Sequence, residues 1–272
     1  MMKNRQPVFF IPHGAGPCFF MDWSPKDEWA KLERYLSEIA ETLPSRPTAI
    51  VLISAHWLTQ DISVTGAEKP SLLYDYYGFP QHTYQLTYPA SGMPDLSKRI
   101  VDQLSAAGMT ATLDNDRGFD HGVFIPLKIM FPAADIPVVQ VSLKRSLSAV
   151  EHIALGKLLA PLRDEGVLII GSGMSFHNMR GYGKASFTQP SKRFDDWLAG
   201  ALSDVASRDE ALSAWEKAPG ARESHPTGEE EHLIPLMVAV GAAGQDPGMK
   251  DFSDTILQTQ ISAFRFSEET IE

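Results

Sequence analysis

The sequence predicts an α/β protein with a single domain, in which helices flank a mostly parallel central sheet. Two observations lead to this fold class. Short, nearly continuous apolar runs recur along the 272 residues, and longer stretches with helical spacing lie between them. Such runs are typical of strands covered on both faces. Alternation of strand and helix indicates parallel strands joined by right-handed crossovers.

Four apolar runs are the expected strands of this sheet: residues 7–11, 49–53, 137–141 and 166–170. Three stretches carry apolar residues at helical spacing, within residues 29–43, 96–104 and 150–162, and are expected helices. In residues 256–266 apolar and polar side chains alternate less regularly, a pattern that fits a strand at the edge of the sheet. Residues 65–88 are rich in Tyr, Pro and Gly and are expected to form an ordered loop.

Composition and charge narrow the function classes. With 24 Lys and Arg against 34 Asp and Glu, the net charge is -10, which argues against nucleic acid or an anionic membrane surface as the main partner. No apolar stretch approaches the roughly 18 to 20 residues that span a bilayer. The single cysteine cannot form an internal disulfide and residues 1–12 do not resemble a signal peptide, so the expected location is cytoplasmic. One domain over residues 1–272 is expected.

Three of the expected strands run into a histidine near their carboxyl ends. These residues are His13, His56 and His177. In an open α/β sheet, ligands bind in the crevice beyond the carboxyl ends of the strands, so the three side chains can converge there. A buried histidine taken alone is more often a hydrogen-bonded structural residue. Three in equivalent positions indicate a metal site.

Glycines at positions 14, 16, 171 and 173 border two of these histidines and permit tight turns or close backbone approach. The segment around residue 14 lacks the third glycine of a dinucleotide-binding loop, so no dinucleotide cofactor is expected. The segment around residue 172 lacks the spacing of a nucleophile elbow. Cys18 is followed by two phenylalanines, which favours a buried and inert thiol.

Two further histidines lie at expected helix starts. His121 belongs to the segment 119–122 that opens a helical run over residues 123–130, where Asp120 is expected to cap the helix and His121 to point back towards the site. His232 begins an apolar run that ends near residue 240, directly after three glutamates at positions 229–231. Acidic residues are favoured at the first turn of a helix. His82 and His152 have no comparable setting and are expected to be surface or structural residues.

Together, the motifs around these residues resemble the DOPA-dioxygenase branch of the class III extradiol ring-cleaving dioxygenases. The resemblance covers residue 8 to about residue 244 and rests on an ordered set of motifs: His13-Gly14, Ser54-Ala55-His56-Trp57, Tyr77-Gly78-Phe79-Pro80, Gly118-Phe119-Asp120-His121-Gly122, Ser172-Gly173 with His177-Asn178-Met179-Arg180, and Glu231-His232-Leu233-Ile234-Pro235-Leu236. It implies a single α/β domain with one non-haem metal ion at the carboxyl edge of the strands.

The resemblance also implies roles for the histidines. His13, His56 and His232 match metal-binding positions. His177 matches the acid/base histidine, which is close enough to be a fourth ligand, and His121 matches a residue that hydrogen-bonds substrate or bound oxygen. Ferrous oxygenases more often use two histidines and one carboxylate, so a third imidazole leaves Fe(II) and Zn(II) both open. A glutamate at positions 229–231 is the alternative third ligand.

The implied reaction is cleavage of a catechol ring by O2 to a muconate semialdehyde. DOPA, caffeate, protocatechuate and simpler catechols share the diol, and the sequence does not distinguish them. Two rival functions are a zinc hydrolase, in which the same histidines activate water, and a non-enzymatic binding protein like the Memo proteins, which have a similar fold. The expected partners are a small catechol and O2, and a homo-oligomer is compatible with the sequence.

Overall fold

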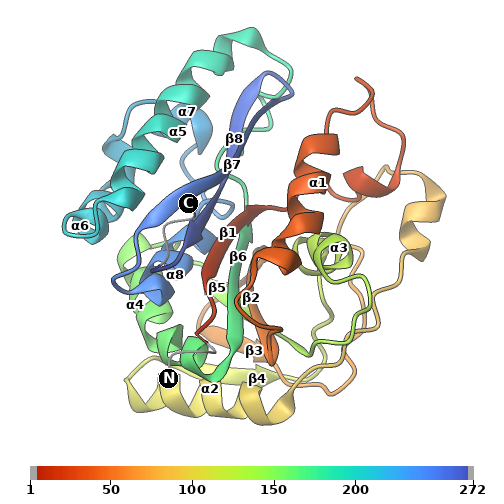
Figure 1. Cartoon of the computed structure of the whole chain (residues 1–272), viewed down its shortest axis with the longest axis vertical. Helices are drawn as coiled ribbons and strands as arrows, with labels where there is room; N and C mark the ends of the chain where they lie inside the picture. Colours follow the sequence, from red (N-terminus) through yellow and green to blue (C-terminus); the bar gives the residue numbers. More distant parts are fainter. Residues whose placement is uncertain (1–4, 269–272) are drawn as a thin grey trace.

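The computed structural model describes residues 5–268, and its centre is an eight-stranded sheet in the order β4-β3-β5-β2-β6-β1-β8-β7 (Figure 1). The strands are β1 (Val8–Pro12), β2 (Ala49–Thr59), β3 (Ile62–Thr65), β4 (Ala111–Asp114), β5 (Val138–Lys144), β6 (Val167–Gly173), β7 (Gly248–Ile256) and β8 (Thr259–Phe266). The helices are α1 (Ala30–Glu38), α2 (Pro94–Ala106), α3 (His121–Met130), α4 (Ala149–Leu159), α5 (Thr188–Ser203), α6 (Arg208–Ser213), α7 (Ala221–Ser224) and α8 (Ile234–Ala243).

The four strands expected from the sequence are the four central strands of this sheet. Strands β5, β2, β6 and β1 lie next to one another and are parallel. Antiparallel pairs occur towards the edges, where β8 pairs with β1, β7 with β8, and β3 with β5. The expected α/β class with a mostly parallel central sheet is therefore confirmed, and the carboxyl ends of its central strands meet at one edge.

Helices cover both faces of the sheet, which explains why the central strands are mostly apolar. On one face, α1 and α3 contribute Leu32 and Val123 to a core that includes Ile50 of β2. On the other face, α2, α4, α5 and α8 form a larger core, and Figure 1 shows α4 and α8 on the opposite side of the sheet from α1 and α3. Residues buried from both sides read as continuous hydrophobic runs.

Helix α8 is buried along its whole length, between the sheet and α4. Its contact with α4 needs glycine on both helices. A Cβ atom on Gly156 would lie 2.0 Å from the Val238 carbonyl oxygen, and one on Gly241 would lie 2.0 Å from the Ile153 carbonyl oxygen. This close approach packs the second half of α8 directly against α4.

Three expectations from the sequence need correction. Strand β2 continues to Thr59, so His56 lies within the strand and not after it. Residues 256–266 do not form an edge strand, because Ile256 ends β7 and β8 lies between β1 and β7. Val150 belongs to the expected helix α4, but 59% of its surface is exposed, so it is not on the buried face. Within residues 5–268, no helix combines the length and apolar character that crossing a membrane requires.

Candidate metal centre

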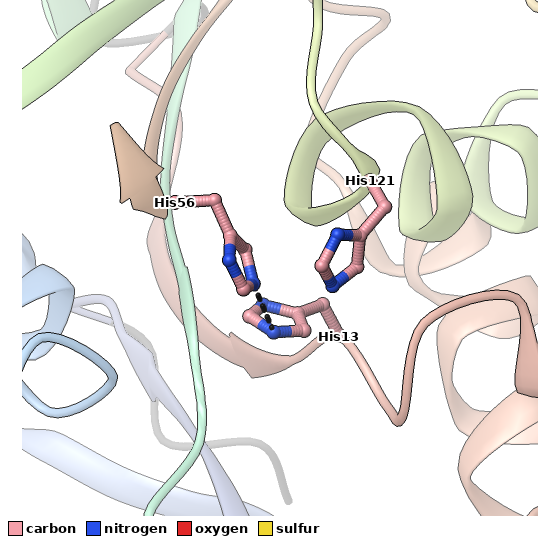
Figure 2. Close-up of side chains that lie close together, drawn as sticks. All are labelled: His13, His56 and His121. Carbon is pink, nitrogen blue, oxygen red and sulfur yellow. Dashed lines mark hydrogen bonds between the residues drawn. The ribbon is translucent and has the colours of Figure 1, made fainter. Parts of the chain in front are cut away.

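Five histidines from distant parts of the chain line one cavity of about 330 Å³. They are His13, directly after β1; His56 in β2; His121, the first residue of α3; His177, after β6; and His232, just before α8. Figure 2 shows the first three converging from separate elements. All five residues singled out in the sequence are therefore brought together, at the carboxyl edge of the central strands.

The loop that carries His232 lies directly against the end of β6. A Cβ atom on Gly173 would lie 2.1 Å from the His232 carbonyl oxygen, so only glycine permits this approach. The same carbonyl accepts a hydrogen bond from the Met174 backbone at 2.9 Å, and the His13 backbone donates to the Gly173 carbonyl at 3.1 Å. These contacts fix His13 and His232 relative to one another, and their ring centres lie 5.3 Å apart.

His56 reaches the cavity because the register of β2 shifts beside it. Strand β2 pairs with β5 up to Ile53 and again from Leu58, with an irregularity between them. Such irregularities redirect side chains near active sites. The Ser54 hydroxyl accepts a hydrogen bond from the His56 backbone at 3.1 Å and donates to the buried Asp120 carboxylate at 2.7 Å.

The sequence suggested that the Asp120 side chain caps α3, but this side chain makes no capping hydrogen bond there. Its carboxylate is fully buried and accepts hydrogen bonds from three side chains: Ser54 at 2.7 Å, Arg117 at 3.0 Å and Gln140 at 2.5 Å. Asp120 thereby connects β2, β5 and the start of α3. Its position helps to hold His56 and His121 in place, since both are attached to elements that Asp120 connects.

The hydrogen bonds of His13 identify its tautomer. The Ser172 hydroxyl donates to the Gly122 carbonyl at 2.5 Å, so it has an acceptor position left for the His13 Nδ1–H, 3.1 Å away. Nε2 of His13 therefore carries a lone pair. That atom lies 3.1 Å from Nε2 of His56, the contact drawn in Figure 2.

Asp75 orients two further histidines, and sequence reasoning did not single it out. Its Oδ1 accepts a hydrogen bond from Nδ1 of His121 at 2.7 Å and from the His121 backbone at 3.0 Å. Its Oδ2 lies 3.7 Å from Nδ1 of His56. Burial opposes ionisation of Asp75, but the hydrogen bonds from His121 and the adjacent imidazoles lower its pKa to about 2. A carboxylate on Nδ1 fixes the ring and leaves Nε2 directed at a ligand.

Glu231 performs the same task for His232. Its Oε1 accepts from Nδ1 of His232 at 3.0 Å and lies 3.9 Å from Nδ1 of His177. The rings of His177 and His232 are stacked with their centres 3.4 Å apart. Of the other two glutamates in the acidic segment, Glu230 is paired with Arg222 and Glu229 with Arg180. Glu231 is thus the one member of the segment that contacts the histidines.

Burial keeps these imidazoles neutral. It lowers the pKa of His13, His56 and His232 well below the usual value, with neighbouring imidazoles adding to the effect. Burial and the neighbouring imidazole of His121 lower the pKa of His177 to about 4. Neutral imidazole is the form that binds metal ions. The donor set therefore fits a divalent transition metal, because neutral imidazole nitrogens from several elements face the same cavity.

The remaining histidines and the cysteine lie outside this constellation. Cys18 is buried, and burial raises its thiol pKa, as expected for an inert thiol. His82 hydrogen-bonds the Phe20 carbonyl at the surface. His152 is a buried structural residue, with Nδ1 bonded to the Ser148 carbonyl and Nε2 to the Lys144 backbone. His225 is fully buried and bonded to the Ser175 carbonyl.

Comparison with known proteins identifies the family. Residues 7–263 match the family described as the catalytic LigB subunit of aromatic ring-opening dioxygenase. The chain belongs to this family. It is 41% identical over 246 residues to the 4,5-DOPA dioxygenase extradiol of Beta vulgaris, with 89% of each chain covered. It is 38% identical over 273 residues to the protein of that name from Escherichia coli, with 96% of each covered.

Two further relatives agree with this assignment. The LigB-family chain is 35% identical to the dioxygenase tasH of Hapsidospora irregularis, over 98% of this chain and 87% of that protein. A crystal structure of Escherichia coli K12 protein JW3007 superimposes with a TM-score of 0.76 at 32% identity, covering 97% of this chain and 100% of that one. The expected class, an extradiol ring-cleavage dioxygenase with a non-haem metal, an aromatic substrate and O2, is confirmed.

Proposed function

We propose that this LigB-family protein opens the ring of a catechol with O2 at one metal ion held by His13, His56 and His232, and that residues 1–272 form one catalytic domain. The observation that carries the proposal is the convergence of five histidines on one cavity, with Nε2 of His13 and Nε2 of His56 3.1 Å apart. The three ligand rings lie close enough to share an ion, since His232 is 4.9 Å from His56 and 5.3 Å from His13 between ring centres.

An all-imidazole ligand set is favoured over one that includes a carboxylate. Glu231 is the candidate carboxylate, but its Oε1 accepts a hydrogen bond from Nδ1 of His232. A carboxylate in that position is the usual hydrogen-bond partner of a metal-bound histidine. We propose Fe(II) as the working ion, with Zn(II) able to compete for the same three nitrogens. A bound Fe(II) would supply the redox chemistry that joins catechol and O2, and its charge would favour the ionised catechol.

His177 is the proposed acid/base residue. Its pKa of about 4 leaves it neutral near pH 7, so it can accept a proton from a catechol hydroxyl at Nε2. Glu231 lies 3.9 Å from Nδ1 on the other side of the ring and would stabilise the imidazolium formed. The stacking of His177 on His232 keeps it beside the proposed ligands. The proton can then be returned to the opened product.

His121 is the proposed partner of substrate or bound oxygen. Asp75 accepts the proton on its Nδ1, so Nε2 faces the cavity as a hydrogen-bond acceptor. His121 would therefore hydrogen-bond a catechol hydroxyl through Nε2 without binding the metal, and Asp75 would keep the ring in that orientation.

The function is tested by oxygen consumption after anaerobic loading with Fe(II), using a panel of catechols and following the absorbance of the semialdehyde. A Zn(II)-loaded sample is the matched control. Equimolar oxygen uptake and ring-opened product in the iron form alone would support the proposal. No uptake by any catechol, with iron content verified at one per chain, would overturn it.

The role of His177 is tested by His177→Ala. Loss of a general acid/base lowers kcat by about 10²- to 10⁴-fold. We expect that loss while the metal content stays near that of the unmodified protein, because three other imidazoles hold the ion. A metal content that falls with kcat would show His177 to be a required ligand and would contradict the assignment.

A further inference from the structure

Away from the histidines, the cavity that holds the catalytic site is walled by aromatic and other apolar side chains. They are Trp23, Trp29, Phe79, Met179, Tyr182 and Leu257. These residues come from four separate segments of the chain, so the wall is assembled by the fold. Together with the five histidines and the turn at residues 14–16 they make up the described lining.

The position of this wall makes it the binding surface for whatever substituent the catechol carries. The diol is required at the histidine end, since that is where the metal ligands are. The rest of the substrate must then lie against the apolar wall. At about 330 Å³ the cavity is near the lower limit of ligand pockets, which run from about 300 to 1,000 Å³. It has room for a short substituent.

The surface next to this wall is acidic. Trp23 and Trp29 also border a neighbouring depression whose charged lining is Asp22, Asp27, Glu28 and Glu33 with one lysine, Lys26. A substrate carboxylate would therefore meet an apolar wall inside the cavity and like charge beyond the two tryptophans. Burying an unpaired carboxylate against apolar side chains is costly.

The arginines that contact elements of the site already have partners. Arg117 donates to the His56 carbonyl and to Asp120, and Arg180 is paired with Glu229. Among residues 5–268, neither of these two arginines belongs to the lining of the cavity. A substrate carboxylate would have to displace one of these pairs to find a cation.

We infer that this cavity selects catechols that bear a short, uncharged and apolar substituent, and that it discriminates against a carboxylate at the same place. The inference rests on the proposed function and refines it. It separates this chain from what the names of its relatives would suggest, because DOPA carries a carboxylate and an ammonium group on the substituent.

The test compares two substrates that differ in one group. In 4-propylcatechol the substituent ends in a methyl group, and in 3-(3,4-dihydroxyphenyl)propanoate it ends in a carboxylate. We expect kcat/KM of the iron-loaded protein to be higher for 4-propylcatechol by about tenfold or more. An equal or higher value for the acid would overturn the inference while leaving ring cleavage established. Cleavage of neither, nor of any other catechol, would instead overturn the proposed function.

Two exposed positions provide matched variants. Met179 lines the cavity and is 68% exposed, so Met179→Arg places a cation at the wall at little risk to folding. It should shift the ratio of kcat/KM values towards the acid by several-fold, whereas Met179→Gln, of similar length and no charge, should not. Tyr77 is 90% exposed and does not line the cavity, so Tyr77→Arg controls for surface charge. An equal shift in all three variants would overturn the inference.

Binding can be followed without turnover. In the Zn(II)-loaded protein under anaerobic conditions, 4-propylcatechol should quench tryptophan fluorescence at lower concentration than the acid does, since Trp23 and Trp29 line the cavity. The quenching should decrease in Trp23→Phe. Equal affinity for both compounds would contradict the inference even if their turnover differed.

Discussion

Strand β1 has a buried polar cluster at each end, and the two clusters differ in how their hydrogen bonds are satisfied. At its amino end, the arginine cluster consists of Arg163, Asp246 and Arg208. Arg163 donates to the Gln6, Ala242 and Ala243 carbonyls and to the Asp246 carboxylate. Arg208 donates to two further carbonyls of the loop after α8. Nearly every donor has an acceptor within the protein.

At the carboxyl end, the histidine cluster is satisfied on one side only. The Nδ1 atoms of His13, His121 and His232 are bonded to Ser172, Asp75 and Glu231. Their Nε2 atoms face the cavity, where Nε2 of His13 lies 3.1 Å from Nε2 of His56. Buried polar groups in native proteins are normally paired. The difference teaches that a cluster paired within the chain maintains the fold, while one with lone pairs left over is built for a ligand.

The largest effect should come from His56→Ala, which removes a proposed ligand from the histidine cluster. We expect metal content and ring-cleaving activity to fall by more than the roughly 10- to 100-fold that loss of an outer partner costs. Metal analysis after dialysis measures the first and oxygen uptake the second. Normal metal occupancy in a folded His56→Ala protein would refute the ligand assignment.

The arginine cluster should respond in stability and not in metal binding. Arg163 is 1% exposed and its removal leaves Asp246 buried without its partner. Breaking such a pair costs about 3 to 5 kcal/mol, so Arg163→Ala should lower the free energy of unfolding in urea by about that amount. Metal content per folded molecule should be unchanged. If instead the metal were lost at temperatures where the variant is folded, the two clusters would not be separable.

Asp75→Asn tests whether a partner of the histidines matters without binding the metal. The amide keeps the size of the side chain but removes the charge that His121 and His56 face. Loss of an outer partner typically costs 10- to 100-fold in affinity or activity, and we expect a loss of about that size in kcat/KM. The matched control is Asp114→Asn, which lies at the end of β4 and contacts only the backbone of its own turn. An active Asp75→Asn protein would show the contact to be incidental.

The smallest effect concerns pH and a histidine outside both clusters. His152 is neutral in the folded protein, because burial lowers its pKa and its Nε2 accepts from the Lys144 backbone. The unfolded chain takes up a proton near pH 6.5, so this residue should reduce stability as pH falls below that value, by at most about 1.4 kcal/mol per pH unit. In His152→Asn, the decline in unfolding free energy from pH 7 to pH 5 should be shallower. An unchanged slope would show that His152 does not contribute.

The sequence predicted the centre of the fold and the histidines of the site, because both have local signals. A strand buried on both faces is a continuous apolar run, as at Ile50–Ile53, and a histidine that follows such a run is visible in the sequence. Asp75 has no such signal. It lies in an irregular loop, and its partner His121 comes 46 residues later, so only the folded chain shows that they meet. The place of β8 inside the sheet was missed for a related reason: its neighbour β1 lies at the other end of the chain.

The position of β1 between β6 and β8 has a consequence for how the protein is made. Strand β1 is synthesised before the other seven strands, but the strand that pairs with it on one side begins at Val167 and the strand on the other at Thr259. At about 5 to 20 residues per second, the ribosome needs on the order of 10 s to reach the first of them. During that time β1, fully apolar in its buried residues, has neither partner. We expect chaperones to protect the segment that holds β1 until its partners are made, and the metal site to be completed only after His232 has been synthesised.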